Sequence, residues 1–153
     1  MSERAIIDTS ALIALEKINF LEILCKIYDE IILPEAVIKE YGTLNIDCYS
    51  SRTVESYLTG LLIRDLNLGK GEAEVISLGN ETGLRIIMDD EKGRKAAKTM
   101  GLSITGTIGI LLKAQKLGLI QSAYAKAKEL RDKGFYVSNT LLEEIAKYGK
   151  NKK

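Results

Sequence analysis

The chain has 153 residues, of which 46% are hydrophobic, and this is enough for one domain whose core folds without disulfides or structural metal ions. It contains no histidine, which excludes a Ser-His-Asp triad, a Cys-His pair and a histidine zinc site. The net charge of +1 hides an asymmetry, since residues 1–90 hold 8 Lys+Arg against 16 Asp+Glu and residues 91–153 hold 14 against 5. An acidic half that gathers cations and a basic half that meets phosphates suit an enzyme that acts on nucleic acid.

The two cysteines, Cys25 and Cys48, are too few for a disulfide framework, so we expect reduced thiols. No apolar stretch approaches the roughly 20 residues that span a bilayer, and the N-terminal residues do not resemble a signal peptide. These features predict a cytoplasmic protein with no membrane attachment.

Short β-branched runs alternate with amphipathic segments in the first half of the chain. Residues 4–8 predict a buried strand that ends at Asp8, followed by a helix capped by Thr9 or Ser10. A second helix is expected near residues 19–27 and a second strand over residues 30–33. Pro34 then starts a helix, because its missing amide hydrogen costs nothing there, and Gly42 ends it.

The same alternation continues to the C-terminus. Residues 43–51 are polar and predict a loop, residues 61–65 predict a strand, and a helix is expected from about Gly71. Residues 84–89 form the clearest buried strand, which precedes a lysine-rich helix, a short strand over residues 102–105 and another helix. The remaining chain predicts a helical region over about residues 121–148, interrupted at residues 134–138, and a frayed basic tail over residues 149–153.

This alternation predicts a single domain over residues 1–153 with an α/β fold, a three-layer α/β/α sandwich around a central parallel sheet. In such sheets the ligand crevice lies outside the carboxyl ends of the strands. The acidic residues placed near these ends or at nearby helix starts are Asp8, Glu40, Glu72, Asp89 and Asp90. Clustered carboxylates hold hard cations such as Mg²⁺ or Mn²⁺, so the pattern predicts a metal-dependent phosphodiesterase.

Four blocks resemble PIN-domain ribonucleases by their order and spacing: IleIleAspThrSer, LeuProGluAlaValIleLysGlu, GlyLysGlyGluAlaGlu and IleIleMetAspAspGluLysGlyArg. The resemblance spans roughly residues 4–120 and is closest to small prokaryotic PIN-like proteins. It implies hydrolysis of single-stranded or structured RNA with one or two Mg²⁺ or Mn²⁺ ions. Matched by position, it implies Asp8, Glu40, Glu72 and Asp90 as catalytic metal ligands, with Asp89 beside them as a further ligand. Relatives of this kind act as toxins with a small antitoxin protein or form homodimers, so both partners are expectations.

Each carboxylate also has a structural interpretation. Asp8 and one member of the Asp89/Asp90 pair could cap the helices that follow them, and Glu72 sits where a helix dipole favours an acid anyway. Glu74 is expected to be structural or to support the metal ligands without binding the metal itself. The alternative to a nuclease is a non-catalytic PIN-like scaffold that binds RNA or a protein partner. Binding of a divalent metal separates the two interpretations.

Overall fold

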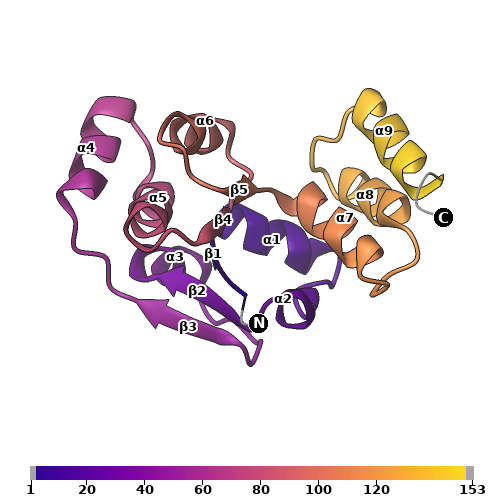
Figure 1. Ribbon diagram of the computed structural model, residues 1–153, viewed down its shortest axis with the longest axis horizontal. Helices are drawn as coiled ribbons and strands as arrows, with labels where there is room; N and C mark the ends of the chain where they lie inside the picture. The colour runs from indigo at the N-terminus through magenta and orange to yellow at the C-terminus, as the bar shows by residue number, and fades with distance from the viewer. Residues whose placement is uncertain (1–2, 151–153) are drawn as a thin grey trace.

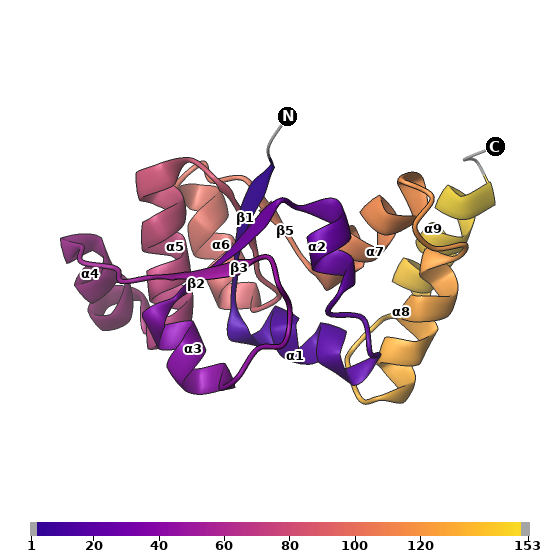
Figure 2. The ribbon, with the colours of Figure 1, turned by 90° about the horizontal axis from the view of Figure 1, so that it is seen from below.

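The computed structural model describes residues 3–150 and shows five parallel strands covered by helices on both faces. The strands are β1 (Arg4–Ile7), β2 (Glu30–Pro34), β3 (Tyr49–Arg52), β4 (Arg85–Ile87) and β5 (Ile104–Thr105). The helices are α1 (Thr9–Lys17), α2 (Ile23–Ile27), α3 (Glu35–Tyr41), α4 (Tyr57–Leu66), α5 (Lys70–Thr82), α6 (Glu91–Thr99), α7 (Thr107–Lys116), α8 (Ala123–Asp132) and α9 (Asn139–Lys150). The predicted three-layer α/β/α class is confirmed (Figures 1 and 2).

The strand order is β3-β2-β1-β4-β5, and every neighbouring pair is parallel. The register aligns Ile6 with Ile32 on one side and with Ile86 on the other. These apolar strands are buried because helices cover both faces of a parallel sheet. The strand order changes direction next to β1, so the carboxyl ends of β1 and β4 open into the crevice where such folds bind ligands.

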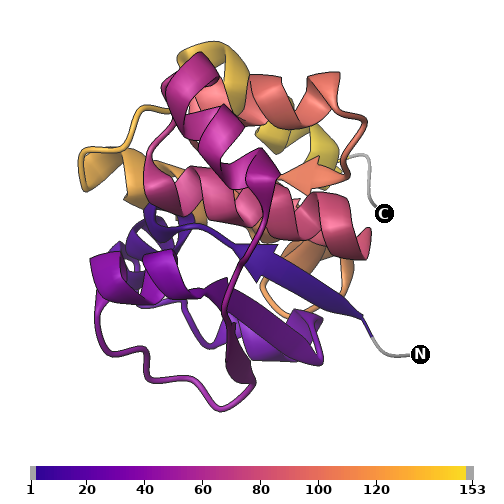
Figure 3. The same ribbon diagram turned by 90° about the vertical axis from the view of Figure 1, so that its left-hand side faces the viewer.

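Helix α5 packs against β1, β2 and β4, and α4 packs on α5 away from the sheet (Figure 3). Helix α8 instead packs on α7, and α9 packs on α8, at the end of the molecule opposite α4 (Figure 1). A second apolar cluster joins this pair to α1 and α7 through Ala14, Ile18, Leu111, Leu130 and Val137. The C-terminal helices are therefore fastened directly beside the ends of the central strands.

Two predicted elements are wrong. Residues 61–65 belong to α4, which Ser56 caps through the Leu58 N–H at 3.1 Å, because a short apolar run fits a helix as well as a strand. Part of the predicted loop over residues 43–51 is the edge strand β3, whose side chains are mostly exposed and therefore show no buried alternation. Of the tail predicted to be frayed, residues 149 and 150 lie in α9, and residues 151–153 lie outside the described residues.

The expectation of two reduced thiols is also wrong. Cys25 and Cys48 form a disulfide, with their Cα atoms 5.6 Å apart. Cys25 lies in α2 and Cys48 just before β3, and both elements pack beside β2, so the fold brings together two residues separated by 23 positions. The disulfide removes the argument from reduced thiols for a cytoplasmic protein. Within residues 3–150 no helix is long and apolar enough to cross a membrane.

Candidate metal-binding and nucleic-acid site

Asp8 is the most buried of the five predicted site residues, with 1% of its surface exposed. It follows β1 and is the N-cap of α1, where its Oδ1 accepts the Ala11 N–H at 2.9 Å. The Ser10 hydroxyl donates to both carboxylate oxygens, at 3.1 and 3.0 Å. Asp8 therefore caps the helix itself, and the expected caps, Thr9 and Ser10, do not.

Burial raises the pKa of Asp8 from 3.8 to about 7, although its hydrogen bonds with Ala11 and Ser10 work in the opposite direction. The negative charges of Asp89 and Glu72 are smaller contributions to the same rise in pKa. Two of the other predicted ligands are thus close enough to Asp8 to act on it electrostatically.

The Asp89 and Asp90 carboxylates each hold the start of a helix. Asp90 is the N-cap of α6 and accepts the Gly93 N–H at 2.8 Å, whereas Asp89 accepts the Thr107 N–H at the start of α7, also at 2.8 Å. The Thr107 hydroxyl donates to the second oxygen of Asp89. Both carboxylates line one cavity, so the cap role that we expected for only one of them does not separate the pair.

Glu72 stands in the first turn of α5 and accepts the Gly69 N–H at 2.9 Å. Burial raises its pKa, the hydrogen bond with Gly69 lowers it, and the charges of Asp90 and Glu40 raise it again. Glu72 is therefore coupled electrostatically both to Asp90, which follows β4, and to Glu40 in α3.

A cavity of about 370 Å³ brings three of the five predicted residues together. Its polar wall is formed by Ser10, Glu72, Asp89, Asp90 and Thr107. Its apolar wall comes from α1, α7, α8 and the connection that follows α8, through Ala14, Ile108, Leu130, Phe135, Tyr136 and Val137. The aromatic residues of this wall are the part of the site that sequence reasoning missed. The only signal for them was the break between the last two helices at residues 134–138.

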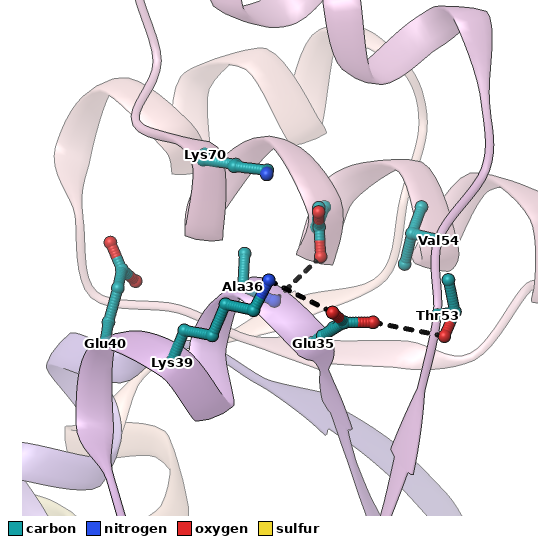
Figure 4. Close-up of a pocket in the computed structure, with 8 residues that line it drawn as sticks. Glu35, Ala36, Lys39, Glu40, Thr53, Val54 and Lys70 are labelled. Carbon is teal, nitrogen blue, oxygen red and sulfur yellow. Dashed lines mark hydrogen bonds and ion pairs between the residues drawn. The ribbon is translucent and has the colours of Figure 1, made fainter.

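Glu40 lines a neighbouring cavity of about 300 Å³ instead (Figure 4). The Thr9 hydroxyl, next to Asp8 in the chain, donates to Glu40 at 2.8 Å. Figure 4 shows Glu40 apart from the ion pair between Lys39 and Glu35, which measures 3.1 Å. The carboxylate of Glu40 also lies against the backbone of α5 at Gly71, where an added Cβ would have to displace it.

Glu74 lies in the same cavity but has a structural role. The residue is 6% exposed, and its carboxylate accepts the Ala36 N–H at the start of α3, at 3.0 Å. This hydrogen bond fastens α3 to α5 and so helps to position Glu40 near Glu72. The arrangement agrees with the structural role expected for Glu74.

The five carboxylates gather at one edge of the sheet, yet among residues 3–150 no three acidic or cysteine side chains are arranged to hold one metal ion together. Local hydrogen bonds orient four of the carboxylates toward backbone N–H groups: Asp8, Glu72, Asp89 and Asp90. An all-oxygen donor set with accumulated negative charge fits a hard cation such as Mg²⁺ or Mn²⁺ by its chemistry. Binding one would require these side chains to turn toward a common point.

A family model described as a PIN domain matches residues 4–150. No curated protein matches the chain. The match covers all five strands and all nine helices of the described chain, including the α8–α9 pair beside the acidic cavity. By this match, the chain belongs to the PIN-domain family.

Proposed function

We propose that this protein is a metal-dependent endoribonuclease that hydrolyses RNA phosphodiester bonds with Mg²⁺ or Mn²⁺. The observation that carries the proposal is the electrostatic connection among the five carboxylates. Asp89 and Glu72 act on Asp8, and Asp90 and Glu40 act on Glu72. Such mutual repulsion in a partly buried site costs folding stability, and a bound cation would offset it.

The position of each carboxylate decides how it would bind the cation. Glu72, Asp89 and Asp90 line the open cavity and would contact the cation first, while Asp8 would bind it from the buried side. The hydroxyls of Ser10 and Thr107 orient Asp8 and Asp89 and reduce the freedom that these carboxylates lose on binding. A divalent cation would neutralise charge on the phosphate and lower the pKa of the attacking water.

The test is cleavage of labelled single-stranded RNA in Mn²⁺, with EDTA as a control and a double variant, Asp8→Asn with Asp90→Asn. We expect cleavage that requires the metal and is lost in the double variant. The matched control is Asp65→Asn, which neutralises an exposed carboxylate of α4 and should leave cleavage unchanged. Cleavage that survives in the double variant would contradict the assignment of the site.

A second candidate is a non-catalytic PIN-like scaffold that binds RNA or a protein partner. It is favoured by the side-chain conformations, because the four carboxylates that accept backbone N–H groups act as ordinary caps and turn supports. Calorimetric titration with Mn²⁺ separates the candidates. If the protein is a nuclease, the wild type should release or absorb binding heat that Asp8→Asn does not. If it is a scaffold, the wild type and Asp8→Asn should give the same heat.

The toxin role, the small antitoxin and the homodimer stay predictions that rest on the family resemblance. Under the nuclease proposal, a toxin should arrest growth when it is expressed alone. The Asp8→Asn, Asp90→Asn double variant should relieve that arrest, because it removes the hydrolysis and keeps the surface that an antitoxin would contact.

A further inference from the structure

The connection between α8 and α9 forms part of the wall of the acidic cavity. Phe135, Tyr136 and Val137 form this wall, and Glu72, Asp89 and Asp90 line the same cavity. Figure 1 shows the connection on the side of the α8–α9 pair that faces α6, the helix that Asp90 caps. Any substrate that reaches the carboxylates through this cavity therefore passes this wall.

Within the connection, Tyr136 differs from its two neighbours. Val137 is 5% exposed and belongs to the second apolar cluster, and Phe135 packs against that cluster. Tyr136 is 92% exposed. The chain is thus anchored on both sides of a large ring that packs against almost nothing.

Hydrogen bonds hold the connection in one conformation. The N–H groups of Gly134 and Phe135 donate to the carbonyls of Arg131 and Leu130, at 3.0 and 3.1 Å. The Arg131 guanidinium donates to the Asn139 side chain at 2.8 Å, which joins the end of α8 to the start of α9. A ring presented from a braced loop loses little conformational freedom on binding a ligand.

Exposure alone does not mark a binding residue, and Tyr57 makes the comparison. Tyr57 is 97% exposed on α4, but it lines neither the acidic cavity nor the cavity that shares Tyr136 with it. Tyr136 lines both the acidic cavity and an adjoining one of about 560 Å³, to which Arg131 also contributes. An aromatic ring beside a guanidinium offers a base a stacking surface and a phosphate a cation.

We propose that Tyr136 stacks on an unpaired base of an RNA strand that enters the acidic cavity. The inference rests on the proposed ribonuclease function. A base inside a duplex has both faces covered by its neighbours and cannot stack on a side chain, whereas a base in a single strand can. Arg131, in the adjoining cavity, would contact a phosphate further along the same strand.

The test measures the affinity of RNA in the Asp8→Asn background, in which the proposed cleavage is blocked, with Mg²⁺ present. A fluorescent single strand is compared with strands that carry one abasic nucleotide at successive positions. At one position, the missing base should weaken binding by about fivefold to 150-fold. Adding Tyr136→Ala should remove that penalty and should weaken binding of the intact strand by the same factor.

Two further variants separate stacking from other effects. Tyr136→Phe keeps the ring and should retain the abasic penalty, which a role of the hydroxyl would not explain. Tyr57→Ala removes an equally exposed tyrosine at the far end of the molecule and should bind like its parent. Thermal melting should show Tyr136→Ala folded as stably as the parent, because the ring buries almost no surface.

The outcomes distinguish this inference from the function on which it rests. If the parent binds RNA and the abasic penalty persists in Tyr136→Ala, the stacking inference is overturned and the nuclease proposal stands. Equal affinity of the parent and Tyr136→Ala for the intact strand would also overturn the stacking inference and leave the nuclease proposal standing. It would favour a protein partner at this ring. If the wild type neither binds nor cleaves single-stranded RNA in Mn²⁺, both are overturned.

Discussion

Asp8→Asn should stabilise the metal-free protein near neutral pH. The substitution removes the charge of a buried carboxylate and keeps its hydrogen bonds, because an asparagine oxygen can still accept the N–H of Ala11 and the hydroxyl of Ser10. One pKa unit corresponds to about 1.4 kcal/mol. A rise from 3.8 to about 7 therefore corresponds to about 4 kcal/mol of unfolding free energy, which the ionised Asp8 removes from the wild type.

The sign of the pH dependence follows from the direction of the pKa change. Because the folded protein binds the Asp8 proton more tightly than the unfolded chain does, folding is favoured when this residue is protonated. The stabilisation is fully present below the unfolded pKa of 3.8, falls as the pH rises toward about 7, and is absent above it. The difference between wild type and variant therefore reports the charge of Asp8 together with its repulsion by Asp89 and Glu72.

The assay is urea denaturation of both proteins in EDTA over the range from about pH 4 to about pH 8. We expect equal stability at the acidic end and a variant more stable by about 4 kcal/mol at the alkaline end. Mn²⁺ at 100 times its dissociation constant should then add about 2.7 kcal/mol to the wild type and much less to the variant. A difference between the two proteins that stays constant across the pH range would refute the reasoning.

Three further substitutions test the structure. Cys48→Ser opens the disulfide with Cys25, whose loop spans 23 residues, and should lower the unfolding free energy by about 3 kcal/mol; a loss that persists against reduced wild type would point to another cause. Gly71→Ala would place a methyl group on the Glu40 carboxylate, so Mn²⁺ affinity measured by calorimetry should fall while thermal stability changes little; an unchanged affinity would remove Glu40 from the site. Its matched control is Gly60→Ala in α4, where the new methyl group meets only the guanidinium end of the flexible Arg64 side chain. This control should raise stability by about 1 kcal/mol and leave Mn²⁺ affinity unchanged, and a loss of stability in urea denaturation would contradict the packing seen there.

Most of the sheet could be predicted from local pattern. Three of the four strands correctly predicted, β1, β2 and β4, are runs of β-branched residues buried on both faces, which leave a strong signal in the sequence. The polar edge strand β3 leaves no such signal, because it pairs only with β2 and its side chains mostly face solvent. The apolar residues of α4 mislead for the opposite reason, since the helix buries Leu62 and leaves Leu61 and Leu66 about half exposed.

The acidic residues show the same division. Their positions after strands and at helix starts were visible in the chain, because strand ends and caps are local features. Their partners were not visible: Asp89 meets Thr107 and Thr9 meets Glu40 across separations of 18 and 31 residues. The sequence could also not show which carboxylates line the open cavity, because that depends on how α5, α6 and α7 pack around the strand ends.

By itself, the sequence determined the fold class and the acidic character of the sheet edge. Both follow from hydrophobic periodicity and residue type, which act over a few neighbouring residues. The tertiary structure alone decided that Asp8 is buried enough to titrate near neutrality, that Cys25 and Cys48 meet, and that Tyr136 lines the same cavity as three of the carboxylates. These features depend on the packing of segments far apart in the chain, and burial, electrostatic coupling and proximity arise only once those segments have come together.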